Sequence, residues 1–156
     1  MFWEGLGEFF GNYMLISAIL SWFVAQIIKI FTGLYQNGKM SLAKIIFSTG
    51  GMPSSHSATI VALATAAGME HGLGSPLFAI ATILATIVMI DATGVRYETG
   101  KQGKFLNEIA AEIFSGNPEK ADAGFKELVG HTPLQVIMGA LLGFGVAFGL
   151  SFLMLV

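Results

Sequence analysis

The chain has 156 residues, of which 54% are hydrophobic and 12% are charged, and its mean hydropathy is +0.71. A soluble globule of this size needs far more charge on its surface, so the composition predicts an integral membrane protein covered by lipid. The chain has no cysteine, which excludes disulfides and thiolate metal sites, and its net charge of −2 argues against a nucleic-acid partner.

Four apolar segments predict an all-α, polytopic membrane bundle with about four transmembrane helices. Residues 13–31 and 133–156 are each long enough to cross roughly 30 Å of hydrocarbon. Residues 77–90 form a shorter segment that extends at both ends, and residues 55–69, rich in Ala and Thr, suit a helix buried among the others. We expect residues 1–156 to form a single integral membrane domain.

The basic residues predict the topology. They lie at the end of the first span, in the loop after it, and between the third and fourth spans: Lys29, Lys39, Lys44, Arg96, Lys101, Lys104, Lys120 and Lys126. Because basic loops favour the cytoplasmic side, both loops are expected to face the cytoplasm and both termini the outside, in a bacterial inner membrane. This topology gathers the polar ends of four helices at the cytoplasmic face.

Between the third and fourth spans, the spacing of apolar residues over residues 103–114 predicts an amphipathic helix. Phe105, Ile109 and Ile113 recur on one face, and charged residues such as Glu108 lie on the other. This pattern is typical of a helix that lies along the bilayer interface. We expect this helix to cover the polar helix ends as a roof.

A turn rich in glycine and serine, residues 50–58, leads into the second span. Free N–H groups and the positive end of a helix dipole bind phosphate, and the hydroxyls of Ser54 and Ser55 and the ring of His56 would add donors. The alternative is an ordinary capped helix start with an interfacial histidine, because Ser and Pro are common at helix N-termini.

His131 has similar surroundings at the start of the last span. Gly130 precedes it, Thr132 is a candidate N-cap, and Pro133 occupies the first helical position. A helix N-terminus disfavours the imidazolium form, which keeps the ring neutral and suits it to act as a nucleophile. The alternative is a histidine that only reaches toward the interface. Two histidines predicted on one face of the membrane favour a shared site.

Three charged residues complete the candidate set. Asp91 lies near the end of the third span, and ionisable residues in membrane segments are candidates for function. Arg96, the only arginine, offers a planar group suited to phosphate, unless it forms a structural ion pair with Asp91. Lys29 would bind phosphate, or it would simply extend to the interface.

The motifs resemble those of the type 2 phosphatidic acid phosphatase and vanadium haloperoxidase superfamily. Pro53-Ser54-Ser55-His56 is similar to its Pro-Ser-Gly-His motif, with Ser55 in the glycine position. His131 followed by Gly139-Ala140-Leu141-Leu142-Gly143 resembles the last motif. With Asp91, Gly94-Val95-Arg96, Leu106-Asn107 and Gly130-His131-Thr132-Pro133, the set is similar to the small divergent membrane branch and covers residues 26–145.

This resemblance implies a phosphohistidine mechanism that needs no metal and no cofactor. By analogy, His131 attacks phosphorus, and His56 protonates the leaving oxygen and later helps to activate water. Lys29, Arg96 and the loop amides would hold the equatorial oxygens. A metal site built from the histidines conflicts with the expected topology, which places His71 across the membrane.

The chain also departs from the superfamily pattern. Phe125 stands where an arginine is usual, and Gln135 stands where an aspartate is usual. Glu127 or Asp91 could replace the missing carboxylate as a catalytic residue. The departures leave the orientation of the nucleophile open.

The expected function is hydrolysis of a membrane lipid phosphomonoester, with phosphatidylglycerophosphate, phosphatidate or a polyprenyl phosphate as substrate. The alternative is a non-catalytic protein that binds lipid head groups, or acts as a scaffold, and retains the phosphate cradle. The expected partners are therefore the lipid substrate and the membrane, without nucleic acid. The glycine-rich last span could serve dimer packing in a homo-oligomer, or close packing within one bundle.

Overall fold

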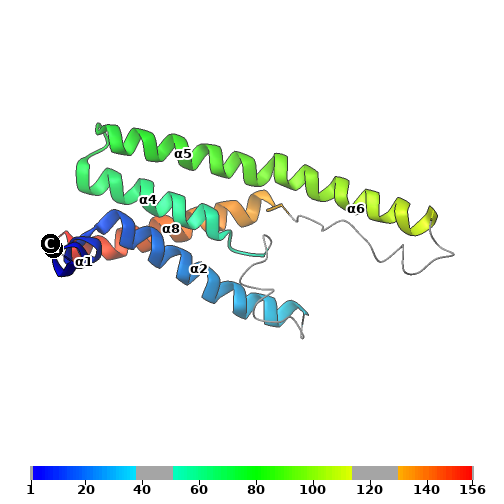
Figure 1. The fold of residues 1–156 in the computed structure, drawn as a ribbon, viewed down its shortest axis with the longest axis horizontal. Helices are drawn as coiled ribbons and strands as arrows, with labels where there is room; N and C mark the ends of the chain where they lie inside the picture. Colours follow the sequence, from blue (N-terminus) through cyan, green and yellow to red (C-terminus); the bar gives the residue numbers. More distant parts are fainter. Residues whose placement is uncertain (1, 38–50, 114–129, 156) are drawn as a thin grey trace.

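The computed structural model describes residues 2–37, 51–113 and 130–155 (Figure 1). Within these ranges it is helical and has no strand, which confirms the all-α class. Its helices are α1 (Phe2–Gly11), α2 (Tyr13–Asn37), α4 (Ser55–His71), α5 (Pro76–Thr93), α6 (Val95–Ile113) and α8 (Pro133–Met154).

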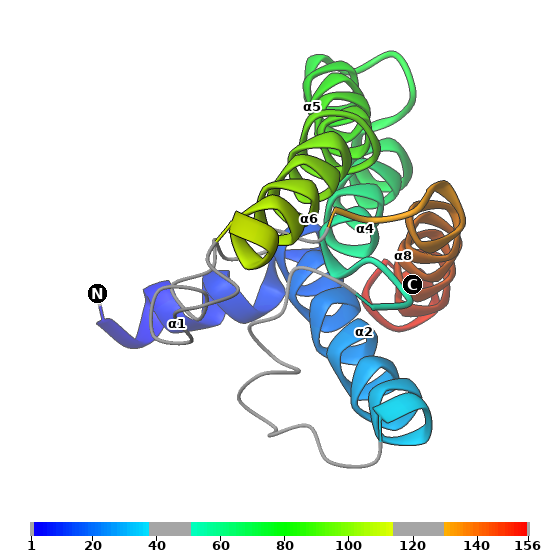
Figure 2. The ribbon, with the colours of Figure 1, turned by 90° about the vertical axis from the view of Figure 1, so that its right-hand side faces the viewer.

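Three helical segments in the described ranges are long and apolar enough to cross a membrane: Tyr13–Thr32, Pro76–Ala110 and Pro133–Met154. The fourth expected span, α4, has 17 residues, which corresponds to about 25 Å. Seen along the bundle in Figure 2, α4 lies among α2, α5 and α8. Helix α4 therefore lies alongside the three longer helices, which cover much of its surface.

Alanine makes the central position of α4 possible. Ala58, Ala62, Ala66 and Ala67 are completely buried, and their small side chains let the surrounding helices approach closely. Ala81 and Ala85 of α5 pack against the same helix. Close backbone approach through small residues is the usual way in which membrane helices associate, because lipid provides no hydrophobic drive between them.

The contact between α4 and α8 depends on two glycines. A β-carbon added at Gly139 would collide with the carbonyl oxygen of Ser54, and one added at Gly143 would collide with that of Ala58. By contrast, Gly145 and Gly149 have open space where a β-carbon would stand. Only the glycines on one face of α8, Gly139 and Gly143, therefore bring this helix against the first half of α4.

The connections bring the polar helix ends to one end of the bundle (Figure 1). The ammonium group of Lys29, in α2, donates a hydrogen bond to Ser55 at the start of α4. The N–H of His131, just before α8, donates to the carbonyl of Ala92 at the end of α5. The turn between α4 and α5 lies at the opposite end and passes through Gly72, whose φ is +84°.

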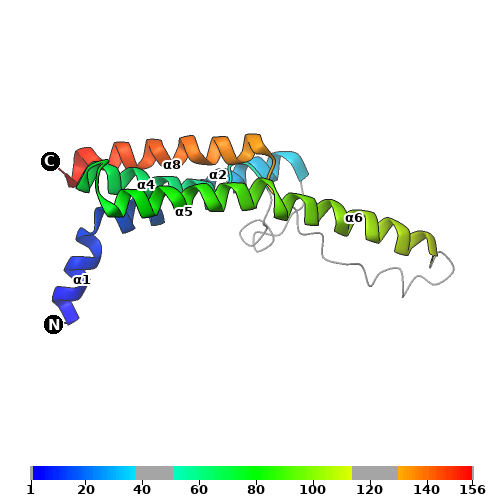
Figure 3. The ribbon, with the colours of Figure 1, turned by 90° about the horizontal axis from the view of Figure 1, so that it is seen from above.

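The amphipathic helix is present but its direction differs from the expected roof. Helix α6 continues the direction of α5 beyond the bundle (Figure 3). The physical reason is that Gly94 alone separates the two helices, and its N–H still bonds to the carbonyl of Ile90. Such a short break keeps α6 nearly in line with α5.

We expect Gly143→Ala to destabilise the bundle, because its β-carbon meets backbone atoms of α4 that cannot move aside. Overpacking of this kind costs about 1–3 kcal/mol. The free energy of unfolding, measured by SDS titration in mixed micelles, should fall by that amount. Gly145→Ala is the matched control and should leave stability unchanged or slightly increased. Equal effects of the two changes would contradict this packing.

Candidate functional site

The start of α4 forms a buried cluster of hydroxyl groups. Ser54 is the N-cap, and its side chain accepts hydrogen bonds from the N–H of Ser57 at 3.3 Å and from the hydroxyl of Ser57 at 3.0 Å. Ser54, Ser55 and Ser57 are all buried. This is the N-terminus that the sequence indicated, with the positive end of the helix dipole directed toward the polar end of the bundle.

Lys29 places a buried positive charge beside this helix start. Its side chain is 3% exposed, and its ammonium group donates to the hydroxyl of Ser55 at 3.2 Å. Gly51, with φ of +95°, passes over the aliphatic part of the lysine side chain. Within the described ranges no carboxylate pairs with this ammonium group. A buried charge with a neutral partner is costly, which makes the place suited to an anion.

His131 lies at the same place, held by its backbone. Its N–H donates to Ala92 at 3.1 Å, and its side chain is 2% exposed. Its Nε2 atom is buried without a hydrogen-bond partner in the described part of the chain. Burial, followed by the positive charges of Lys29, His56 and Arg96, lowers the pKa of His131 from 6.5 to about 4. The ring is therefore neutral at physiological pH.

The second histidine stands beside the first. The ring centroids of His56 and His131 are 6.1 Å apart, and the ring planes make an angle of 79°. His56 is exposed, whereas His131 is buried. Two imidazoles this close can both contact one small anion that lies beside the pair, and the exposed ring of His56 gives access from solvent.

Gln135 connects the two helix starts that carry the histidines. Its side-chain oxygen accepts from the N–H of Thr132 at 3.0 Å, and its own N–H donates to the Thr132 hydroxyl, which completes a capping box. Its backbone carbonyl accepts from the N–H of Ser54 at 3.0 Å. Sequence reasoning treated Gln135 as a departure from the family pattern, although the Thr-x-x-Gln spacing already indicates a capping box.

Asp91 and Arg96 form an ion pair across the break between α5 and α6. Both side chains are partly exposed, and Arg96 is close enough to lower the pKa of His131 by its positive charge. Gly130 packs directly on the backbone of Arg96 and Tyr97, where a β-carbon would collide. The structural ion pair that was the alternative interpretation of Arg96 is therefore present, and it lies close to the two histidines.

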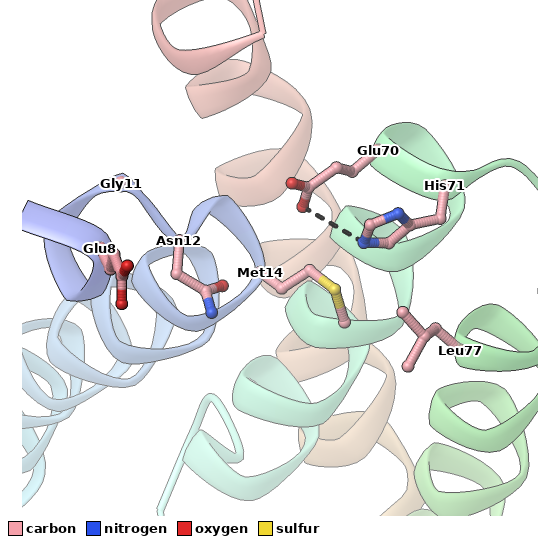
Figure 4. A pocket seen from close by; sticks show the side chains of 7 residues that line it. All are labelled: Glu8, Gly11, Asn12, Met14, Glu70, His71 and Leu77. Atoms are coloured by element: carbon pink, nitrogen blue, oxygen red, sulfur yellow. Dashed lines mark ion pairs between the residues drawn. The ribbon is translucent and has the colours of Figure 1, made fainter. Parts of the chain in front are cut away.

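The other candidate residues lie apart from this cluster. Glu127 falls outside the described residues, as does Phe125. His71 lies at the opposite end of the bundle, where it lines an open pocket of about 590 Å³ (Figure 4). Its Nε2 atom is 3.9 Å from a carboxylate oxygen of Glu70. In the described ranges, His, Asp and Glu side chains do not gather in a group of three or more that could hold a metal ion.

The family model described as "Divergent PAP2 family" matches residues 10–146. The chain belongs to the divergent PAP2 family. It is 40% identical over 146 residues to the uncharacterized membrane protein YuiD of Bacillus subtilis (strain 168). The aligned region covers 87% of this chain and 92% of the relative. These findings confirm the family resemblance and the assignment as a membrane protein. No solved structure matches the chain.

Lys29→Met should separate the stability of the fold from anion binding. Removing a buried charge that has no carboxylate partner in the described ranges should leave the free energy of unfolding unchanged or raise it, because the cost of desolvating that charge is removed. Binding of orthovanadate to the purified protein should nevertheless fall at least tenfold, as measured by equilibrium dialysis. Lys101→Met, which removes an exposed lysine paired with Glu98, is the matched control and should change neither quantity. Retained vanadate binding in Lys29→Met would rule out the anion site.

The low pKa of His131 should be visible directly by NMR. Because burial disfavours the charged ring, the resonances of the His131 ring should titrate with a midpoint near pH 4. The shift is downward, so the neutral ring persists as pH falls below 6.5 and is lost only near the lower value. A midpoint close to 6.5 would contradict the buried position of this ring.

Proposed function

We propose that this protein is a metal-independent phosphatase that hydrolyses a phosphomonoester of a membrane lipid. Phosphatidylglycerophosphate, phosphatidate and polyprenyl phosphates are the candidate substrates. The observation that carries the proposal is that two buried groups near each other lack partners among the described residues: the ammonium of Lys29 has no carboxylate there, and Nε2 of His131 has no hydrogen bond there. An oxyanion with a phosphorus centre satisfies both, since it offers acceptors to the lysine and an electrophile to the neutral imidazole.

In the proposed mechanism, Nε2 of His131 attacks phosphorus in line while the bond to the lipid oxygen breaks. His56 gives its proton to that leaving oxygen and then accepts a proton from the water that attacks the phosphohistidine. Free phosphate departs, and both rings return to their starting states. Lys29, Ser55 and the N–H groups at the start of α4 stabilise the charge on the equatorial oxygens.

A lipid substrate is favoured by the surroundings of the site. Immediately beyond His131, the first turns of α8 present Leu134 and Ile137, which are 60% and 55% exposed. In a protein of the membrane these faces meet acyl chains. A phosphate held by Lys29, Ser55 and His131 would therefore lie beside the hydrocarbon that a lipid tail enters. A soluble phosphate ester would gain nothing from this arrangement.

A second candidate function is binding of a lipid head group without hydrolysis. One observation favours it: the two residues that could orient His131 are already engaged in structural contacts. Gln135, in the usual aspartate position, caps α8, and Asp91 is paired with Arg96. In the described ranges no carboxylate is bonded to His131, so a chain that keeps the cradle and has lost turnover would look similar.

The two functions are separated by phosphate release and phosphoenzyme trapping. With a panel of the candidate lipids and a chelator present, the protein should release phosphate and form an acid-labile adduct. His131→Ala should abolish the adduct. His56→Ala should slow turnover by about 10²–10⁴-fold while still allowing some adduct from substrates with good leaving groups.

The control is His71→Ala, which alters a histidine at the opposite end of the bundle and should keep full activity. Equal adduct in His131→Ala and His56→Ala would contradict the assigned roles. Tight vanadate binding without phosphate release from any lipid would establish the binding function in place of hydrolysis.

A further inference from the structure

Helix α6 carries an apolar face that nothing in the described structure covers. Phe105 is 63% exposed, Leu106 47%, and Ile113 69%, and Ile109 lies between them on the same face. These residues recur at helical spacing on a helix that also carries the charged residues Lys101, Lys104 and Glu108. Four large apolar side chains on one stripe of a projecting helix mark an interaction surface.

The length of the α5–α6 segment restricts where this surface can lie. Pro76–Ala110 spans 35 residues, which corresponds to about 52 Å, whereas the hydrocarbon layer is about 30 Å thick. If α5 crosses the bilayer, α6 begins at its surface. A straight α6 would therefore hold its apolar face in water.

The break at Gly94 is the place where α6 can be redirected. Its backbone angles, φ of −99° and ψ of −95°, depart from helical values. A β-carbon at this position would stand 2.9 Å from the carbonyl oxygen of Ile90. The hydrogen bond from Glu98 to Gly94 starts a new helix on the far side of the break. The two helices are thus separate units joined at one residue.

The charges of α6 indicate which membrane surface it fits. Lys101 pairs with Glu98 at 2.9 Å, and Lys104 lies 3.9 Å from Glu108. Each lysine thus has a carboxylate beside it on the same helix, so neither pair adds a net positive charge that would attract anionic lipids. Helix α5, which leads into α6, also has exposed apolar side chains, among them Ile87 and Ile90. The fitting partner is the interface of the same bilayer, bound through apolar contact.

We propose that α6 pivots at Gly94 and lies in the head-group layer beside the bundle, with the face of Phe105, Leu106, Ile109 and Ile113 in the acyl region. The helix docks on neutral lipid as well as on anionic lipid, because each of its lysines already lies beside a carboxylate of the same helix. This position makes α6 a surface anchor of the membrane domain rather than a cover over the histidines.

The absence of cysteine from the chain makes a labelling test direct. The full chain is placed in nanodiscs of zwitterionic phosphatidylcholine, with single cysteines introduced for nitroxide labels. The apolar-face positions are Phe105→Cys, Ile109→Cys and Ile113→Cys; the polar-face positions are Lys101→Cys, Lys104→Cys and Glu108→Cys. The measurement is the ratio of collision with oxygen to collision with a water-soluble nickel chelate.

The expected ratio is several-fold higher at every apolar-face position, with a helical period, and it is unchanged by added salt or anionic lipid. Phe105→Ser should lower the ratio at a label on position 109, whereas the matched change Glu108→Ser should not. A uniformly water-exposed helix, a uniformly lipid-exposed helix, or a ratio that depends on anionic lipid would each overturn the proposal.

Discussion

The buried ammonium group of Lys29 is the constraint on which this site depends. A charge removed from water and left without a carboxylate costs several kcal/mol even after the protein relaxes around it. The hydroxyl of Ser55 satisfies one of its donors, and the neighbouring histidine is neutral. The surrounding bundle must offset this cost, and the arrangement makes physical sense if an anion completes it.

The offset comes from packing of small residues around α4. Gly139 and Gly143 let α8 touch the backbone of α4, and the buried alanines let α2 and α5 approach from other sides. The same contacts set the register of the helix ends. Because the carbonyl of Gln135 accepts from the N–H of Ser54, the starts of α4 and α8 cannot slide past each other. The distance between the two histidines is therefore a product of helix packing.

Much of this arrangement could be predicted from the sequence, because hydrophobic length and the positions of basic residues are strong signals in membrane proteins. They placed Lys29, His56 and His131 at the polar ends of their helices, and alternation of the chain direction brings these ends together. The caps at Ser54 and Thr132 were also predictable, since they depend on local residue pattern.

The direction of α6 could not be predicted from its amphipathic pattern, which fixes which face is apolar but not the angle to α5. That angle depends on the backbone at Gly94. The role of Gln135 was missed for a different reason. Comparison with the family motif marked it as a lost carboxylate, whereas its contacts with Thr132 and Ser54 show that it joins two helices. Whether Glu127 supplies a carboxylate stays a prediction from sequence.

The most direct measurement of the central claim is an experimental structure of the protein with orthovanadate, an analogue of phosphate in transfer. We expect vanadium to be bonded to Nε2 of His131, with its oxygens contacting the ammonium of Lys29 and the ring of His56. Vanadate bound elsewhere, or vanadate bound at His131 with Lys29 pointing away from the anion, would contradict this prediction.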